Sequence, residues 1–422
     1  TGYYEEYKEY KKLARYGLPF ITVGDTIIKS TDLISRKWMS NDFYGLVWSF
    51  KYRKERLDAT FGGGANNYNG DHFGRIIWMK YPGTIEKDYQ WYFNNGTKRE
   101  FSFFGKADYA ITDKISVYGD LQYRYIKYKM TGQDDDLKDI TQLHHFGFFN
   151  PKAGIFLSVT PDQDAYFSLS VANREPTRAD FKEAAGDTGA TPGPETLYDS
   201  ELGYKLRGEK YSLAVNLYGM FYKDQLVPTG ELSNVGYPIM TNVKESSRIG
   251  LELNTGIKPF DFLNWNFGIT ISSNKIKNFT EHYINYVSID STEEYKSKNL
   301  GTVDIAYSPS IIATSDLNYR ISMTCDIHFI SKYVGEQYFD NTMNAERMLN
   351  PYFVNNLRID FNPRIPGIRG VDFQLLINNI FNSDYVSNAY GGTSYVDDTG
   401  YSWAYYFPQA GTNFMIKAGL TF

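Results

Sequence analysis

The sequence predicts an all-β protein, an antiparallel transmembrane β-barrel that crosses the membrane with its strands. Three observations predict it. The chain is rich in aromatic residues and yet hydrophilic on average, many segments alternate between apolar and polar residues, and the connections between these segments are short and long by turns.

The composition of the 422 residues, with 37 Tyr and 29 Phe, is 17% aromatic. Mean hydropathy is nevertheless negative, at -0.45. A soluble protein would bury so many rings in an apolar core, and its hydropathy would rise with them. A membrane barrel instead carries apolar side chains outward and polar side chains on its inner face, turns and loops. The composition therefore favours a barrel.

Alternation extends over about ten residues or more in many segments, as in a strand whose two faces meet different environments. In residues 115–125 the odd positions are apolar, aromatic or Gly, and the even positions are mostly polar. Residues 211–218 and 414–422 divide in the same way. About fifteen strands are expected on this pattern. We place them at residues 38–53, 56–67, 99–111, 115–130, 146–160, 164–174, 196–207, 210–227, 240–257, 262–277, 300–315, 317–334, 351–362, 370–383 and 411–422.

The connections between the expected strands are of two kinds that take turns. Short ones are built from turn formers, as at residues 54–55 and 112–114. Long ones are polar and rich in Gly, Asn and Tyr, and they cover residues 68–100, 173–196, 278–299, 339–351 and 388–408. Short turns on one rim and long loops on the other are typical of large membrane barrels.

Residues 1–35 carry Lys, Glu and Tyr without sustained alternation, so we expect an external loop segment there and the barrel over residues 36–422. The expected number of strands is odd, whereas single-chain bacterial barrels have even numbers. We therefore expect a companion chain with further strands, and a chain break inside this external loop.

Several other classes of protein are disfavoured. No run of about 18 apolar residues occurs, which excludes a transmembrane helix. The single Cys325 cannot form a disulfide within the chain or a cysteine metal cluster. The net charge of -5 argues against a nucleic-acid partner. Catalytic signatures such as Gly-x-Ser-x-Gly and His-Glu-x-x-His do not occur, so we expect no enzyme and no catalytic residues.

Two groups of possible metal ligands have simpler explanations. His144 and His145 are neighbours on a strand, so they point to opposite faces and cannot share an ion. The run Asp134, Asp135, Asp136 lacks the Gly and the terminal Glu of the twelve-residue calcium loop, which favours a solvated acidic loop. We expect no metal site and no cofactor.

Several segments resemble the β-barrel of TonB-dependent receptors, the energy-coupled importers of Gram-negative outer membranes. The clearest is Ala-Asn-Arg-Glu-Pro-Thr-Arg at residues 172–178, followed by Pro-Glu-Thr-Leu-Tyr-Asp-Ser-Glu-Leu-Gly-Tyr at residues 194–204. Residues 248–253, 306–309 and 378–385 are similar to later segments of that barrel. Phe422, on the apolar face of the last strand, matches the C-terminal signal for barrel assembly.

The resemblance implies a barrel of about 22 strands around an N-terminal plug domain. This chain would hold the last fifteen or so, and the companion N-terminal chain would carry the plug and the remaining strands. TonB would act through that plug. The resemblance also implies the cell outer membrane of a Gram-negative bacterium, with outer-membrane lipid and lipopolysaccharide as partners.

Candidate substrate contacts lie in the long loops. His72 lies in an Asp-His-Phe-Gly segment, and Arg178 in the segment that carries the resemblance. Tyr and Trp offer large, rigid contact area with a polar end. The loop aromatics that we select are Trp91, Tyr92, Tyr390, Tyr395, Trp403 and Tyr405. Long loops also need a core of their own, so packing within the loops stays open as a second interpretation.

Import of a scarce, bulky nutrient driven by TonB is the function that the resemblance implies, with a ferric siderophore, haem or cobalamin as examples. Two alternatives remain open: a passive porin-like channel, and a surface-binding protein that the barrel only anchors. A plug with a TonB box in the companion chain would favour import over both.

Overall fold

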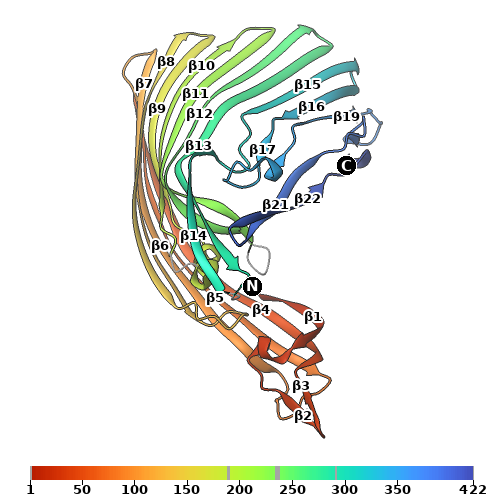
Figure 1. Cartoon of the computed structure of the whole chain (residues 1–422). Coiled ribbons are helices and arrows are strands. Elements are labelled where there is room, and N and C mark those ends of the chain that lie inside the picture. The colour runs from red at the N-terminus through yellow and green to blue at the C-terminus, as the bar shows by residue number, and fades with distance from the viewer. Residues whose placement is uncertain (1, 188–190, 233–237, 290–291, 422) are drawn as a thin grey trace. The chain divides into compact units, whose positions relative to one another are not determined.

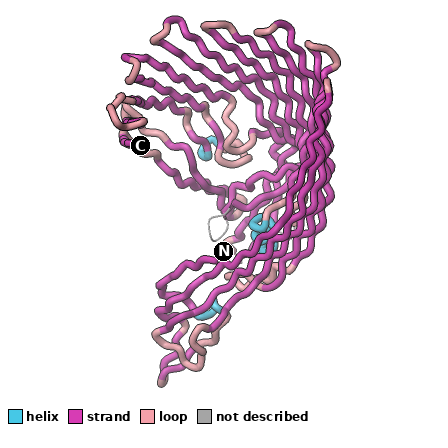
Figure 2. The backbone as a smooth tube through the Cα atoms, turned by 180° about the vertical axis from the view of Figure 1, so that it is seen from behind, coloured by secondary structure: helices cyan, strands magenta, loops and turns pink. Residues whose placement is uncertain are grey.

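The structure is a computed structural model that describes residues 2–187, 191–232, 238–289 and 292–421. Most of these residues form antiparallel strands of one large sheet (Figure 1, Figure 2). The sheet strands are β1 (Gly2–Lys12), β4 (Ser30–Lys54), β5 (Leu57–Met79), β6 (Tyr89–Ala110), β7 (Ile115–Gly132), β8 (Gln142–Thr160), β9 (Gln163–Arg174), β10 (Glu195–Arg207), β11 (Tyr211–Leu232), β12 (Pro238–Phe260), β13 (Leu263–Val287), β14 (Thr292–Asp304), β15 (Ile311–Ser322), β16 (Cys325–Val334), β19 (Tyr352–Phe361), β20 (Gly370–Asn378), β21 (Val386–Val396), β22 (Thr399–Pro408) and β23 (Asn413–Thr421). The smaller elements are η1 (Leu13–Tyr16), β2 (Ile21–Val23), β3 (Thr26–Ile28), α1 (Arg178–Asp187), β17 (Gln337–Tyr338), η2 (Ala345–Arg347) and β18 (Met348–Leu349).

The chain divides into two compact units. The first unit comprises residues 1–109, 118–151 and 175–192, and the second comprises residues 110–117, 152–174 and 193–422. The division cuts across β6, β7 and β8, so each of these strands contributes to both units.

Strands that follow one another in the chain pair with one another. In the first unit β1 pairs with β4, β4 with β5, and β5 with β6. In the second unit the pairs run from β8 and β9 through β13. β13 then pairs with β15 along its first half and with β14 along its second half. From β15 the order is β16, β19, β20 and β23.

Seven hairpins with turns at one end supply fourteen of the long strands, and β23 is the fifteenth. They are β4–β5, β6–β7, β8–β9, β10–β11, β12–β13, β15–β16 and β19–β20. The expected all-β fold with about fifteen barrel strands is therefore confirmed in the part of the chain that the structure describes.

The pairing sorts the side chains of each strand onto two faces. Leu202 on β10 lies opposite Phe167 on β9 and Leu217 on β11, and Leu202 is 52% exposed. Gly203 and Asn216, one position along, share the opposite face. We call the face with the exposed apolar side chains the outer face and the opposite one the inner face. Contact with lipid requires apolar side chains on the outside of a barrel, and the outer face carries them.

One pair of expected strands has the wrong boundaries. We expected strands at residues 300–315 and 317–334, but β14 ends at Asp304, β15 spans Ile311–Ser322, and β16 begins at Cys325. The turn is formed by Met323 and Thr324, which are not turn formers, so the sequence does not mark it.

Most of the long connections expected as loops are extensions of strands. β5 continues to Met79 and β6 begins at Tyr89, so only residues 80–88 connect them. Residues 278–299 and 388–408 lie mainly in the hairpins β13–β14 and β21–β22. Residues 1–35 likewise hold strand β1, which pairs with residues 30–40 of β4. The placement of this segment outside the membrane stays a prediction.

Two strand edges are unpaired among the described residues. β23 pairs only with β20, and residues 42–54 of β4 pair only with β5. Side chains on both faces of these two segments are exposed, including Val47 at 85% and Met415 at 63%. Each of these two edges therefore lacks a second neighbouring strand among the described residues. No helix among the described residues is long and apolar enough to cross a membrane.

Candidate functional site

Polar groups of the first unit gather around helix α1, and a capping box fixes where this helix begins. The backbone N–H and hydroxyl of Thr177 donate hydrogen bonds to the Asp180 carboxylate at 2.7 and 2.9 Å. The Asp180 N–H donates back to the Thr177 hydroxyl at 3.4 Å. This reciprocal arrangement is a capping box, and it satisfies N–H groups that the first turn of a helix leaves free. The sequence Thr-x-x-Asp therefore fixes where α1 begins.

Phe181 anchors α1 to the inner face of the sheet. Its side chain is 1% exposed and clusters with Tyr128, Met130 and Phe146. The ring of His144 stacks on it, with 4.0 Å between ring centroids. Burying a Phe side chain stabilises such contacts by roughly 1.5–3 kcal/mol. His144 therefore packs against α1, and burial lowers its pKa.

Lys182, next to Phe181, ties α1 to the acidic run of the β7–β8 connection. Its Nζ lies 3.1 Å from an Asp135 carboxylate oxygen and 3.5 Å from one of Asp134. Lys37 reaches the other oxygen of Asp135 at 2.6 Å. Burial alone would raise the pKa of Asp135, but the hydrogen bond from Lys37 and the charge of Lys182 lower it to about 2.

The acidic run itself differs from the solvated loop that we expected. One ligand atom each from Asp134, Asp135 and Asp136 lies within 4.8 Å of the others. The Asp134 side chain is 4% exposed, and Arg15 lies 3.6 Å from Asp136. The run is thus partly buried and faces basic side chains. The expectation of a solvated loop is wrong here because contacts with Lys37 and Lys182, far apart in the sequence, are invisible to a local reading.

Arg178 lies on the first turn of α1 and lacks an acidic partner. Its Nη2 donates a hydrogen bond to the Asn94 side chain at 2.6 Å, while its Nε is buried and makes no hydrogen bond. No carboxylate of the described residues forms an ion pair with it, although Lys182 nearby has three within 4.0 Å. Arg178 is only partly buried, but a partly buried cation without a counter-charge favours an anionic group supplied from elsewhere.

His72 lies directly opposite Asn94 in the β5–β6 pair, on the inner face. A β-strand crosses the membrane with about 9–11 residues. Counted from the turn before Leu57, such a span ends before His72, which therefore lies outside the membrane. Burial, and after it the charge of Arg178, lowers the pKa of His72 to about 4. His72 is therefore neutral at pH 7 and offers a hydrogen-bonding ring beside the Arg178–Asn94 pair.

Trp91 and Tyr92 lie in the hydrophobic core of the first unit. They are 5% and 8% exposed and pack with Leu13, Tyr16 and Leu33. The Trp91 ring lies 5.0 Å from that of Tyr16, edge to face. Both side chains pack in this core, and direct contact with a substrate stays a prediction.

In the second unit a buried ion pair holds the connection between β16 and β19. Asp340 is 0% and Arg347 5% exposed, and the two are hydrogen-bonded. Glu281 on β13 lies 3.9 Å from Arg347 and accepts a hydrogen bond from the Tyr395 hydroxyl at 3.5 Å. Burial raises the pKa of Glu281. This network fixes the hairpin β21–β22 against β13.

The four predicted aromatics of that hairpin lie on different faces of it. Tyr395 stacks on Tyr283 of β13, with ring centroids 3.9 Å apart. Tyr390, Trp403 and Tyr405 lie on the other face, where Tyr390 stacks on Tyr405 at 5.2 Å. Trp403 and Tyr405 remain 42% and 59% exposed. Their exposure is compatible with a binding surface, and their role in binding stays a prediction.

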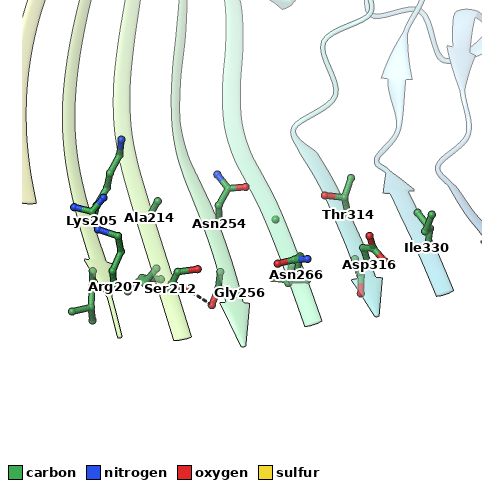
Figure 3. Close-up of a pocket in the computed structure, with 16 residues that line it drawn as sticks. Lys205, Arg207, Ser212, Ala214, Asn254, Gly256, Asn266, Thr314, Asp316 and Ile330 are labelled. Atoms are coloured by element: carbon green, nitrogen blue, oxygen red, sulfur yellow. Dashed lines mark hydrogen bonds between the residues drawn. The ribbon is translucent and has the colours of Figure 1, made fainter. Parts of the chain in front are cut away.

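A further cavity of about 450 Å³ lies on the second unit, near the turns of β10–β13 (Figure 3). Polar and small residues line it, among them Lys205, Arg207, Ser212, Asn254, Asn266 and Asp316. None of the predicted site residues lines this cavity. Phe422, the predicted assembly signal, lies outside the described residues.

Sequence reasoning missed several residues of these sites. Asn94, Lys182 and Arg347 carry the main polar contacts but belong to no recognisable motif. The one available signal was the Thr-x-x-Asp spacing of residues 177–180, which predicts a helix start.

Comparisons with known proteins agree on the fold. The family described as TonB dependent receptor-like, beta-barrel matches residues 2–382. No curated protein matches the chain. Among solved structures, the ferric yersiniabactin uptake receptor FyuA from Yersinia pestis is 14% identical, with a TM-score of 0.64, and the match covers 92% of this chain and 58% of that one.

Two further structures give the same result. The siderophore receptor PiuA from Acinetobacter baumannii is 14% identical, with a TM-score of 0.61 and coverage of 93% of this chain and 56% of that one. The copper transporter OprC is 14% identical, with a TM-score of 0.67 and coverage of 92% and 60%. The chain thus spans somewhat over half the length of the structures that it matches, which is 58% for FyuA.

Proposed function

Because this chain belongs to the TonB-dependent receptor-like β-barrel family, we propose that it forms the larger part of the barrel of a receptor that imports a scarce, bulky and anionic solute with energy from TonB. Members of this family are receptors and transporters rather than enzymes, and they lie in the outer membrane of Gram-negative bacteria.

The observation that carries the anionic part of this proposal is Arg178. Its guanidinium is held on the inner face by Asn94 and by the anchored helix α1, and it has a buried Nε without a partner. Neutral His72 adds a hydrogen-bonding group and no compensating charge. A carboxylate or another anionic group of a metal chelate would accept hydrogen bonds from both.

The similar structures support a metal chelate as the solute. FyuA is described as a ferric yersiniabactin uptake receptor and PiuA as a siderophore receptor. These descriptions belong to those proteins, and here they favour ferric siderophores over haem and cobalamin as the first solutes to test.

The unpaired edges support the presence of further strands in the working receptor. Residues 42–54 of β4 and strand β23 each lack a second neighbour among the described residues. Open sheet edges do not persist in lipid, because their N–H and C=O groups would stay unsatisfied. A companion segment that carries the remaining strands and the plug would satisfy both edges and give TonB its point of attachment.

Uptake in cells tests the proposal. Cells with the receptor are offered radiolabelled ferric catecholate, ferric hydroxamate and ferric citrate, with and without TonB. We expect at least one chelate to enter only when TonB is present. Arg178→Gln should raise the half-saturating concentration about tenfold or more, since a hydrogen bond to a charged group contributes roughly 1.5–3 kcal/mol. Arg53→Gln is the matched control, because Arg53 pairs with Asp58 beside a turn.

Two other outcomes would support one of the alternative functions instead of import. Uptake that persists without TonB would indicate a passive porin-like channel. Binding of a chelate without uptake under either condition would indicate a surface-binding protein anchored by its barrel.

A further inference from the structure

The outer face of the first unit carries an apolar band next to the short turns. Its side chains lie in rows across β4, β5 and β6, because directly paired residues share a face. Trp48 lies opposite Gly63 and Gly63 opposite Phe103, and the Trp48 and Phe103 rings lie 6.0 Å apart. Leu46, Ala65 and Phe101 form the next row, which is the last apolar one.

Three polar rows follow on the same face. They are Tyr44–Asn67–Arg99, Asp42–Asn69–Thr97 and Ser40–Asp71–Asn95. The Asn95 amide donates to Asn69 at 2.9 Å and to Asp71 at 2.6 Å, and Arg99 donates to Asn67 at 3.1 Å. These side chains therefore form a hydrogen-bonded polar belt where the apolar band ends.

Beyond the polar belt the outer face becomes aromatic again. Tyr4, Trp38, Phe73 and Phe93 lie in one row across β1, β4, β5 and β6. Trp38 and Phe73 stack with 5.4 Å between centroids and 9° between planes, and Tyr4 and Phe93 continue the row at 5.8 and 6.4 Å. Tyr4 is 51% and Phe93 44% exposed. We call this set the outer aromatic row.

Two arginines lie against the outer aromatic row. The guanidinium of Arg36 lies 4.8 Å from the Tyr4 ring centroid, and that of Arg75 lies 5.3 Å from the Phe73 centroid. Glu6 pairs with Arg36 at 2.8 Å. Arg75 is exposed and forms no ion pair with the described residues, so its charge is available to a partner.

The outer aromatic row lies too far from the apolar band to be part of a girdle at the hydrocarbon boundary. Leu46 and Trp38 are eight residues apart on one strand, which is about 26 Å along it. With a strand tilt of about 45°, the row lies roughly 20 Å further out than the last apolar row. The polar belt fills the interval. Exposed rings at this height therefore meet a neighbour other than acyl chains.

We propose that the outer aromatic row, with Arg36 and Arg75, is a docking surface for the core saccharide of lipopolysaccharide. The proposal rests on the outer-membrane placement in the proposed function. The surface is continuous with the lipid-facing band, and outside the acyl chains of the outer leaflet come the sugars and phosphates of this lipid. Flat rings stack on the apolar faces of sugar rings, and the unpaired Arg75 suits a phosphate or acidic sugar.

Native mass spectrometry of the purified receptor tests the proposal. The two probes are rough-type lipopolysaccharide with a complete inner core and lipid A without core sugars. The wild type should retain the first at least about fivefold better than the second. The double variant Trp38→Leu, Arg75→Gln should lose this preference. Phe101→Leu, in the apolar band, is the matched control and should keep it.

Equal retention of the two probes by the wild type would overturn the proposal. A preference for the complete core that survives in the double variant would overturn it as well. Chelate uptake is measured in the same variants. A preference for the complete core in a receptor that imports no chelate would support the docking surface and count against the proposed function alone.

Discussion

Burial and the nearby charge of Arg178 together set the charge state of His72. Burial, and then the charge of Arg178, lowers the pKa of His72 to about 4, whereas an unfolded chain has a His pKa near 6.5. Between these pH values the unfolded state takes up a proton that the folded state resists. Stability should therefore fall as the pH drops from about 6.5 towards 4.

Titration of the five histidines by NMR checks this prediction. In the wild type we expect His72 to titrate near pH 4, and in Arg178→Gln at a higher pH, because one of the charges that lower its pKa is removed. His144, whose pKa is lowered by burial and by the charge of His145, serves as the internal control and should shift less. A His72 pKa near 6.5 in the wild type would mean that the ring is open to water and that this account of the site is wrong.

The sequence alone predicted some of the candidate site residues on firmer grounds than others. Arg178 and His72 were selected for different reasons, and the structure places both beside Asn94, which no motif marks. Trp91 and Tyr92 were selected as aromatic loop residues, but they are buried in a core. Residue type alone does not distinguish a ring that packs from a ring that binds, because both uses favour the same large, rigid side chain.

At the scale of the element, the start of α1 should depend on its capping box. Thr177→Ala removes the hydroxyl that accepts the Asp180 N–H and should cost about 1 kcal/mol of helix stability. Phe181→Ala removes the buried anchor and should cost more, about 3–5 kcal/mol locally. Hydrogen exchange of the α1 amides measures both, and we expect the larger increase in rate for Phe181→Ala.

Thr393→Ala, on the separate hairpin β21–β22, is the control and should leave exchange in α1 unchanged. Equal exchange in wild type and Phe181→Ala would show that α1 is held by something other than the contacts with Tyr128, Met130 and His144.

The strands show where sequence patterns succeed and where they fail. Alternation located the membrane-facing strands because lipid and lumen impose different side chains on their two faces. It missed the outer parts of β5 and β6, where polar residues such as Asn69, Asp71 and Asn95 occupy the outer face as well. Without a difference between the faces, a paired strand and a polar loop have the same composition.

At the scale of the whole molecule, the two unpaired edges give the most direct prediction about the working receptor. Along an antiparallel edge, every second residue directs its N–H and C=O to the missing neighbour. If a companion segment closes the barrel, all amides of residues 42–54 and of Asn413–Thr421 should be protected from hydrogen exchange. If the edges stay open, every second amide should exchange rapidly while its neighbours, bonded to β5 and β20, stay slow.

Amides of Leu202 and Leu217, which lie in strands paired on both sides, supply the reference for full protection. Residue-resolved exchange on the purified receptor in lipid vesicles decides between the two patterns, because period-two exchange at both edges would refute closure by further strands.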